Sequence, residues 1–429
     1  MTTWIKGGEV LQLTPQCHLE KQDILVEDGS IAAVGEVPAQ TKADQTMDAR
    51  GKLIMPGLVN CHTHSYMTLF RNYADDLSFQ QWLFEKIMPV EDRLGGEDAY
   101  WGNMLASIEM IRTGTTTFSD MHMFKHQCVQ SCADTGLRAV LARGLACGQE
   151  DAEGGKRRLD EAFEEMEEAK KGGALVSFML GPHAIYTCHK GYLQELEALA
   201  REKQLRFHIH VSETKHEVDS CKEEHGVSPV QYLAGLGIFD RPTVAAHCVW
   251  VDEEDIDILR EKNVNVVTNP VSNMKLGNGF APFTKMHKAG INLCIGTDGA
   301  ASNNSLNLFR EMSTLSYIHK GVDLEAQSTP ADLMLRCATL NGAKALGLAD
   351  KIGSLEAGKR ADLLLIDLDR PQFQPQNDLV TGLIYAANGS EVDTVLVDGR
   401  VLMEKGELKT IDEEQVYFEM EKRRQKYLV

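Results

Sequence analysis

Histidines and acidic residues gather in four short motifs that lie far apart along the 429-residue chain. Each motif ends an apolar run of the kind that forms a buried strand. The motifs are CHTH at 61–64, HIHVSE at 208–213, AHC at 246–248 and GTDG at 296–299. A single histidine at a strand end is more often a packing residue than a ligand, and aspartate before glycine is common in turns. Four such ends that converge on one volume instead indicate a site for a divalent cation such as zinc.

The choice of metal ligands follows from the alternation of side chains along a strand. Residues two apart share a face, so His62 and His64 can point into the same space. We predict that four side chains bind the metal: His62, His64, His210 and Asp298. His208 shares a face with His210 but lies a layer deeper, so we assign it to core packing or to support of the ligands. The run VSFMLGPH at 176–183 offers no lysine to bridge two ions, which favours one Zn²⁺; Fe²⁺ and Mn²⁺ fit the same ligands.

The remaining polar groups of the motifs suit proton transfer. A bound metal with an open position lowers the pKa of a water ligand to roughly 7 and supplies hydroxide at neutral pH. Glu213 follows His210 by three residues and can pass a proton while free of the metal. Asp298 can accept the water proton, and His247 can hold the hydroxide in line or stabilise charge. These groups predict general acid–base catalysis directed at an unsaturated carbon with a poor leaving group.

Eight apolar runs alternate with helical stretches between about Leu58 and Gly347. The runs are 58–62, 116–120, 139–144, 176–181, 205–211, 243–248, 264–268 and 291–297. Continuous apolar strands separated by helices are typical of a parallel sheet covered on both faces. Eight units over this length predict an α/β protein with a (β/α)₈ TIM-type barrel, whose active site lies at the carboxyl ends of the strands. An open doubly wound sheet is the alternative, although no GxGxxG or Walker motif follows any run.

Both ends of the chain carry β-hairpin patterns. The segments 23–35 and 392–406 alternate apolar and polar residues around Asp28-Gly29 and Asp398-Gly399, dipeptides that suit a tight primed turn. Neither hairpin is stable alone, so we expect both to pair, together with ADLLLID at 361–367, into one small β-sandwich domain. The predicted division is 1–57 and 351–429 for this domain and 58–350 for the barrel. An amphipathic C-terminal helix is predicted over 413–428.

Composition restricts the partners. The chain has 44 Lys+Arg and 63 Asp+Glu, a formal charge of −19, which disfavours nucleic acids and anionic membranes and favours a small-molecule substrate. We expect its ten cysteines to be reduced thiols. The first residues lack a signal-peptide pattern and no apolar run approaches a membrane span, so we expect a cytoplasmic protein. A homo-oligomer would be ordinary for a barrel of this size, but no segment identifies an interface.

Four runs together resemble the amidohydrolase superfamily. They are PGLVNCHTH at 56–64, HIHVSE at 208–213, AAHCVW at 245–250 and GTDGAASNNSLNLFREM at 296–312. Within the superfamily they look most like the 5-methylthioadenosine/S-adenosylhomocysteine deaminases, and the resemblance covers essentially the whole chain. It implies one zinc, held by the four ligands named above. It also implies that Glu213 and His247 handle protons and that Glu213 and Asp298 contact the substrate.

The resemblance implies further substrate-binding residues. Glu91, in the context MPVE, matches a carboxylate that accepts hydrogen bonds from the ribose hydroxyls, and His183, in GPH, matches a contact to the purine. Arg143 and Arg158 match positions that meet the carboxylate of the homocysteine tail. Arg157 competes with Arg158 because the spacing is shifted here, and for each arginine a surface salt bridge is the simpler interpretation.

One aromatic and aliphatic stripe allows two interpretations. Phe79, Trp82, Leu83 and Ile87 recur at helical spacing just before Glu91. Such a stripe is more often core than pocket. Its position before Glu91 equally allows one edge to cover the adenine or thioether of a nucleoside.

These expectations lead to three hypotheses about function. The first is hydrolytic deamination of 5′-methylthioadenosine and S-adenosylhomocysteine to the inosine analogues and ammonia. The second keeps the metal but changes the substrate to adenosine, guanine, a pterin or a chlorotriazine, because fold and metal do not fix the substrate. Glu91 argues against a substrate without ribose. The third, a non-enzymatic scaffold, is disfavoured because every candidate ligand is present.

Overall fold

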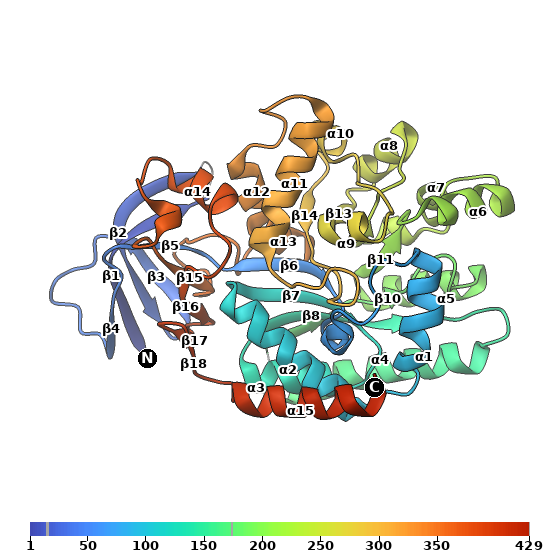
Figure 1. Ribbon diagram of the computed structural model, residues 1–429, viewed down its shortest axis with the longest axis horizontal. Helices are drawn as coiled ribbons and strands as arrows, with labels where there is room; N and C mark the ends of the chain where they lie inside the picture. Colours follow the sequence, from blue (N-terminus) through green and yellow to red (C-terminus); the bar gives the residue numbers. More distant parts are fainter. Residues whose placement is uncertain (14–16, 173–174, 429) are drawn as a thin grey trace.

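Parallel strands form a barrel in the computed structural model, which describes residues 1–13, 17–172 and 175–428 (Figure 1). The strands are β6 (Leu58–Thr63), β7 (Thr115–His122), β8 (Arg138–Leu145), β9 (Val176–Phe178), β10 (Gly181–Pro182), β11 (Phe207–Val211), β12 (Thr243–His247), β13 (Asn265–Thr268) and β14 (Leu293–Ile295). Short β9 and β10 together make up the fourth strand position, and both pair with β8. The predicted TIM-type α/β fold is therefore confirmed, with each strand within a few residues of its predicted run.

Two seams close the barrel. One parallel sheet has the order β10-β8-β7-β6 and the other the order β11-β12-β13-β14. A parallel bridge between Leu180 and Phe207 joins β10 to β11. At the opposite seam, the backbone N–H of Asp298 donates to the carbonyl of His62 at 2.9 Å. The ring is closed, which excludes the open doubly wound sheet, and the second seam brings together two of the predicted metal ligands.

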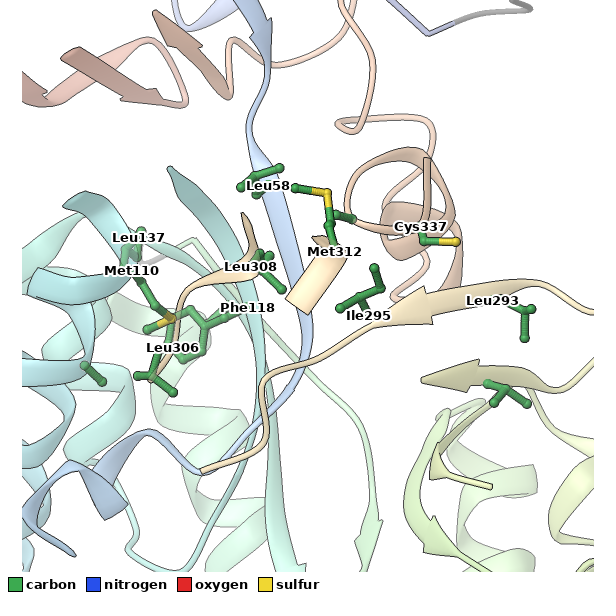
Figure 2. Packing of buried hydrophobic residues seen from close by; sticks show 14 of the residues in the cluster. Leu58, Met110, Phe118, Leu137, Leu293, Ile295, Leu306, Leu308, Met312 and Cys337 are labelled. Atoms are coloured by element: carbon green, nitrogen blue, oxygen red, sulfur yellow. The ribbon is translucent and has the colours of Figure 1, made fainter. Parts of the chain in front are cut away.

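Helices cover the outside of the barrel. They are α2 (Gly96–Arg112), α3 (Gln127–Thr135), α4 (Ala152–Gly172), α5 (Lys190–Lys203), α6 (Lys215–His225), α7 (Pro229–Gly235), α8 (Glu253–Glu261), α9 (Pro270–Lys275), α10 (Phe283–Lys288), α11 (Leu308–Asp323), α12 (Ala331–Cys337) and α13 (Leu340–Ala345). Their apolar faces pack on the strands, as Met110 of α2 does with Phe118 and Met312 of α11 with Ile295 (Figure 2). Burial of this continuous apolar layer is the main source of stability for a barrel of this size.

The two chain ends form one nine-stranded sheet. Its strands are β1 (Thr2–Gln12), β2 (His18–Glu27), β3 (Ser30–Gly35), β4 (Gln45–Asp48), β5 (Lys52–Pro56), β15 (Leu363–Asp367), β16 (Val392–Val397), β17 (Arg400–Glu404) and β18 (Glu407–Leu408). The N-terminal and C-terminal strands meet where β15 pairs antiparallel with β5. Both predicted hairpins are confirmed, since Asp28 and Gly29 have φ of +46° and +77°, and Asp398 and Gly399 of +54° and +74°.

The two faces of the terminal sheet pack against two different hydrophobic clusters. Along β15, Leu363 and Leu365 face a cluster made only by the terminal strands and the segment leading into β15. Leu364 and Ile366 point the other way, into the large core shared with the barrel helices. This alternation is that of a strand buried on both faces. The sheet therefore has its own core and is also fixed to the barrel.

The predicted C-terminal helix is confirmed as α15 (Glu413–Tyr427), and it lies along the barrel rather than on the terminal sheet (Figure 1). Arg423 of α15 pairs with Asp98 of α2 at 3.1 Å and with Glu97 at 2.8 Å. Short connecting helices complete the structure: η1 (Ser65–Phe70), the π-helix η2 (Gln81–Ile87), α1 (Met88–Glu91), η3 (Ile238–Asp240), η4 (Pro371–Phe373) and α14 (Leu379–Tyr385). Among the described residues, no helix has both the length and the hydrophobicity needed to cross a membrane.

Candidate active site

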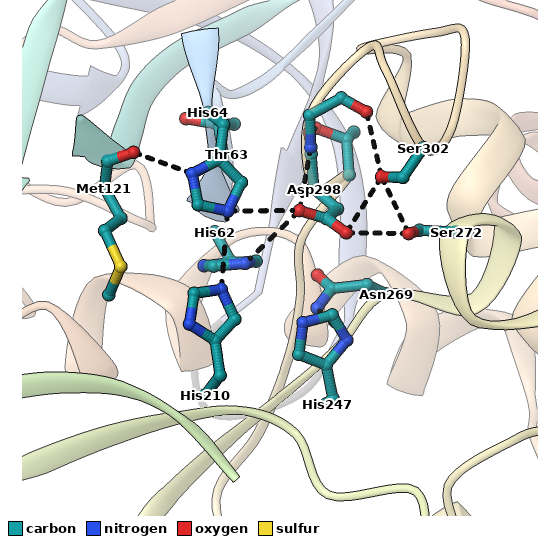
Figure 3. A network of polar contacts seen from close by, with 12 residues as sticks. His62, Thr63, His64, Met121, His210, His247, Asn269, Ser272, Asp298 and Ser302 are labelled. Carbon is teal, nitrogen blue, oxygen red and sulfur yellow. Dashed lines mark hydrogen bonds and ion pairs between the residues drawn. The ribbon is translucent and has the colours of Figure 1, made fainter. Parts of the chain in front are cut away.

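The four predicted metal ligands lie together with His247 at the carboxyl end of the barrel, in two overlapping groups that could hold a metal ion: His62, His64 and His210, and His62, His247 and Asp298 (Figure 3). His62 lies in β6 and His64 directly after it, His210 lies in β11, and Asp298 follows β14. The Nε2 atoms of His62 and His64 each lie 3.4 Å from Asp298 Oδ1. The Nε2 atoms of His64 and His210 are 3.4 Å apart. The structure therefore gathers three imidazoles and one carboxylate from three distant parts of the chain around one point.

Hydrogen bonds behind the rings orient their Nε2 lone pairs toward that point. His64 Nδ1 donates to the carbonyl of Met121 and His210 Nδ1 to the carbonyl of His183, both at 2.7 Å. Because Nδ1 carries the proton, Nε2 is left as the acceptor, which is the arrangement found in metal-binding histidines. His62 Nδ1 faces His208 Nε2 at 2.8 Å, while its buried Nε2 has no hydrogen-bond partner.

The protonation states of the histidines and of Asp298 also suit the binding of a cation. Burial lowers the pKa of His62 to about 4, so this imidazole is neutral at pH 7. Burial alone would raise the pKa of Asp298, but the imidazoles of His62 and His64, each 3.4 Å from its Oδ1, hold the pKa well below its usual range. Converging lone pairs with one ionised carboxylate repel each other unless a positive ion separates them. The residues present therefore fit a divalent metal, and their ligand types are those of zinc sites.

Asp298 is held in place by its own hydrogen bonds and by a strained backbone. Its carboxylate accepts from the hydroxyls of Ser272 at 2.6 Å and Ser302 at 2.9 Å, and from the N–H of Gly299 at 2.8 Å. Its φ of +61° lies in the left-handed region, which costs a non-glycine residue free energy. His247 has the same kind of strain, with φ of +76°. Such conformations persist where the surrounding contacts fix one arrangement, as at active sites.

The two predicted proton-handling groups lie side by side. Glu213 Oε2 is 3.9 Å from His247 Nε2, and Glu213 Oε1 accepts from Asn278 at 3.1 Å. Burial raises the pKa of Glu213 to about 8, with the charge of Asp298 as a further cause, so the carboxyl carries a proton at neutral pH. His247 Nδ1 donates to Asn273 Oδ1 at 2.7 Å, which leaves Nε2 as an acceptor facing the site. One group is thus prepared to give a proton and the other to accept a hydrogen bond.

A pocket opens next to the ligands, and it includes Glu91 and His183. The part-buried carboxylate of Glu91 accepts a hydrogen bond from the hydroxyl of Tyr66. Burial raises the pKa of Glu91, whereas the Tyr66 hydrogen bond acts in the opposite direction. The His183 ring is 4.7 Å from the His210 ring, and its Nδ1 contacts Thr187 Oγ1 at 3.0 Å. Glu91 and His183 are therefore positioned to bind different parts of one ligand.

The aromatic stripe divides between pocket and core. Phe79, Trp82 and Leu83 line the pocket, whereas Ile87 is fully buried. Trp82 and Ile87, both from the π-helix η2, belong to one buried cluster, so only part of the stripe reaches the pocket. Part of the stripe therefore packs in the core, as the first interpretation predicted, and part lines the pocket; contact with a nucleoside stays a prediction.

The structure does not bring the predicted arginines into the pocket. Arg143 is buried and donates to Glu161 Oε2 at 2.9 Å and to the carbonyl of Gly144 at 3.1 Å. Arg158 donates to Asp151 at 2.7 Å and to the carbonyl of Ala146 at 2.8 Å. Arg157 is mostly exposed. Each guanidinium that the sequence assigned to substrate is already paired within the chain.

Several polar residues of the site were missed from the sequence. They are Tyr66, Asn269, Ser272, Asn273, Asn278 and Ser302. Asn269 follows directly after β13, so the rule that function lies at strand ends could have found it, whereas Asn273 lies one turn further on, in α9. Tyr66 and Ser302 lie in connections after β6 and β14, where no sequence period indicates direction. His208 lies behind His62 and contacts Ser119 Oγ at 3.2 Å, in a supporting position.

Comparison with known proteins gives the family. The model of the amidohydrolase family matches residues 53–402. The chain belongs to the amidohydrolase family. This amidohydrolase is 46% identical over 427 residues to a 5-methylthioadenosine/S-adenosylhomocysteine deaminase of Caldanaerobacter subterraneus, covering 99% of this chain and 98% of the relative. It is 43% identical over 425 residues to a 5′-deoxyadenosine deaminase of Methanosarcina mazei, covering 97% and 96%. These matches confirm the predicted family and support the predicted class of enzyme, a hydrolase of C–N bonds.

A solved structure is also very similar to this amidohydrolase. An adenosine deaminase from Xanthomonas campestris, crystallised with bound zinc, superposes with a TM-score of 0.94 at 34% identity. The alignment covers 99% of this chain and 98% of that chain. Together with the ligands described above, this likeness supports a divalent metal at the carboxyl end of the barrel.

Proposed function

We propose that this chain is a zinc-dependent deaminase of adenosine-type thionucleosides, which converts 5′-methylthioadenosine and S-adenosylhomocysteine to the inosine analogues and ammonia. Relatives of 43–46% identity carry this or a related deaminase name over nearly their whole length. The observation that carries the proposal is one pocket lined by Glu91, Glu213 and metal ligands. A carboxylate opposite a hydrolytic centre suits the diol of a nucleoside, and a free base or triazine would leave it without a partner.

The substrate would lie with its ribose at Glu91 and its purine at the metal. Both Glu91 oxygens can accept hydrogen bonds from the 2′ and 3′ hydroxyls, and Tyr66 holds one of these oxygens in position. His183, kept in orientation by Thr187, would contact the purine edge. This placement directs the ring carbon that bears the amine toward Asp298 and His247.

Proton transfers follow from the protonation states of the residues. A protonated Glu213 gives its proton to the ring nitrogen next to the reacting carbon, which makes that carbon more electrophilic. Ionised Asp298 accepts the proton of the attacking water, and His247 Nε2 accepts a hydrogen bond that keeps the attacking oxygen in line. The new C–O bond forms, and the C–N bond to the exocyclic amine breaks as the proton held by Asp298 passes to the departing amine, which leaves as ammonia. The remaining hydroxyl proton on the new oxygen passes to Glu213, which gives the carbonyl product and restores the protonated acid.

One Zn²⁺ would be held by His62, His64, His210 and Asp298. When bound, it would make a water molecule acidic enough to act as a nucleophile at neutral pH. The buried His62 Nε2 without a hydrogen-bond partner supports a metal ligand at this position.

The direct test is ammonia release from both nucleosides by the protein loaded with zinc. We expect turnover, with the inosine analogue formed in equal amount, and loss of activity after treatment with a chelator. A Glu91→Ala variant tests the placement of the ribose, because it should lose efficiency on nucleosides. Undiminished activity of Glu91→Ala would favour another heterocycle as substrate, and no turnover of either nucleoside would refute the proposal.

We also propose a terminal β-sandwich domain of residues 1–57 and 351–429 beside a barrel domain of residues 58–350. The separate core of the terminal strands supports this division. We propose cytoplasmic action on a small-molecule nucleoside. The ten cysteines are all free, nine of them buried, as suits a reducing compartment.

A further inference from the structure

A second buried carboxyl group lies directly behind the backbone of Glu213. It belongs to Glu217 of α6, a residue that is only 4% exposed. Its Oε2 accepts from the N–H of Glu213 at 2.7 Å and its Oε1 from the N–H of Ser212 at 3.1 Å. Burial raises the pKa of Glu217 to about 7, whereas these two N–H groups act in the opposite direction. Glu213 lines the pocket, but Glu217 is absent from the described residues that line it, so an effect of Glu217 on the reaction has to pass through Glu213.

Glu217 has the position of an ordinary helix-capping residue but not the usual contacts. Thr214 is the N-cap of α6, and its hydroxyl accepts from the N–H of Glu217 at 3.0 Å. At the start of α8, Asp252 and Asp255 form a complete capping box, in which the Asp255 carboxylate accepts from the N–H of the N-cap at 3.2 Å. The Glu217 carboxylate instead reaches past its N-cap to the N–H groups of the two residues before it. It therefore holds the segment that carries the proposed acid rather than the first turn of its own helix.

The backbone that Glu217 holds is strained and is also fixed from the opposite side. Ser212 has φ of +50°, a left-handed conformation that a residue other than glycine keeps only where its surroundings fix it. Its carbonyl accepts from the N–H groups of 249–250, both at 3.0 Å, in the segment that follows His247. The peptide unit between Ser212 and Glu213 is therefore held at its N–H by Glu217 and at its carbonyl by the chain that carries His247.

We propose that Glu217 is the positioning residue of the catalytic acid, and that it fixes the peptide unit before Glu213 so that the Glu213 carboxyl faces His247 and the substrate. The inference rests on the proposed deaminase function and on the role of Glu213 in it. The carboxyl itself has one hydrogen-bond donor, Asn278 at 3.1 Å, and lies 3.9 Å from His247. A catalytic group on a loose backbone would sample other directions, and a misplacement of about 1 Å can cost roughly a hundredfold in rate. Glu217 thus contributes to kcat without contact with the substrate.

The kinetics of Glu217→Ala and Glu217→Gln, each loaded with zinc, test this role. Glu217→Ala removes both acceptor oxygens, so kcat for 5′-methylthioadenosine should fall by at least about tenfold, while KM and the amount of bound zinc stay at the wild-type values. Glu217→Gln keeps the shape and one acceptor oxygen, so its kcat should lie between those of the wild type and Glu217→Ala, and it remains informative if the alanine variant does not fold. Wild-type kcat in either folded variant, or a rise in KM alone, would overturn the proposal. No turnover by the wild-type protein would instead refute the deaminase function itself.

A control variant and a double-mutant cycle separate positioning from general stability. Asp255→Ala removes another buried carboxylate at the same position of a helix, so it should lower Tm as Glu217→Ala does but leave kcat unchanged. In the Glu213→Gln background, Glu217→Ala should cause no further fall in kcat, because the acid that Glu217 positions is already absent. An equal fall in kcat for Asp255→Ala, or the same tenfold fall in the Glu213→Gln background, would assign the effect to stability, and the role proposed for Glu217 would be wrong.

Discussion

The inner end of the pocket is made from the ends of separate strands, whereas the opposite wall comes mainly from one continuous segment, residues 66–91. At the inner end, each proposed metal ligand has at least one hydrogen-bond partner behind it, such as Met121 for His64 and Ser302 for Asp298. At the wall, apolar packing against the core holds the side chains, and Phe84 remains 44% exposed. Hydrogen bonds therefore fix the side chains of the inner end. We expect substitutions in the wall to change substrate binding without changing the positions of these side chains.

Removal of the metal should have the largest effect on activity of any change at the inner end. We expect activity to fall to background when the ion is chelated and to return when Zn²⁺ is added, because the proposed metal supplies the acidity of the attacking water. Metal analysis should be followed together with ammonia release. Full activity in protein shown to be free of divalent metal would contradict the assignment of His62, His64, His210 and Asp298 as ligands.

Loss of Glu213 should be the next largest effect. Glu213→Gln keeps the shape but cannot pass a proton, so kcat should fall by roughly 10²–10⁴ while bound metal stays at the wild-type amount. The pH profile gives a second readout. Because the pKa of Glu213 is raised, its acid form is present at neutral pH, and activity should decline as pH rises through about 8. A variant that retains wild-type kcat would exclude Glu213 as the acid.

The hydrogen bonds behind Asp298 should affect metal affinity more weakly. Ser302→Ala removes one donor to the carboxylate, and such supporting groups are typically worth 10- to 100-fold in metal affinity. Competition with a zinc chelator measures the change. Ser390→Ala, at an exposed serine far from the ligands, is the control and should leave affinity unchanged. Equal affinities of the two variants would show that Ser272 and Gly299 alone hold Asp298.

The same contrast explains what could be predicted from the sequence. The convergence of His62, His64, His210 and Asp298 could be predicted because the strand ends of a barrel meet at one end of it. The hairpins were found because Asp-Gly turns are local. The positions of the Arg143 and Arg158 side chains could not be predicted in this way, because a long side chain can reach either the pocket or a neighbouring carboxylate. The positions of Glu161 and Asp151, which decide that choice, depend on the packing of α4 and on the loop before it.

The wall shows a second limit of sequence patterns. The helical period placed Phe79, Trp82, Leu83 and Ile87 in one stripe, but the segment 81–87 is a π-helix, and only the first three residues line the pocket. The parallel pairing of β4 with β1 was likewise absent from the prediction, because it joins segments far apart in sequence with no turn between them to indicate it. Features determined by neighbouring residues, such as the Asp-Gly turns, could be predicted. Features determined by contacts between segments distant in sequence, such as the pairing of β4 with β1, could not.

Tyr66→Phe tests whether Tyr66, which lies between the wall and the inner end, acts in substrate binding or in the reaction. The variant keeps the buried ring but removes the hydroxyl that donates to Glu91, so KM for 5′-methylthioadenosine should rise about tenfold with kcat little changed. Loss of the hydrogen bond also raises the pKa of Glu91 further, and the defect should grow as pH falls. Tyr73→Phe, at a part-buried tyrosine of the same apolar cluster, is the control. A fall in kcat without a change in KM would place Tyr66 with the reacting groups instead.

Phe84→Leu should have the smallest effect on KM of the variants considered. It changes only the wall, so it tests whether the wall acts independently of the inner end. Phe84 lines the pocket from the π-helix and is partly exposed, so a bound substrate covers only part of its ring. At about 25 cal/mol per Å² of apolar surface, loss of roughly 40 Å² of contact corresponds to a rise in KM of about fivefold. Because the wall takes no part in proton transfer, kcat and its pH profile should remain those of the wild type. Phe418→Leu makes the same substitution at an exposed phenylalanine of α15 and should change nothing. A change in the pH profile of Phe84→Leu would mean that wall and metal end are coupled, and the separation of the two regions would then be wrong.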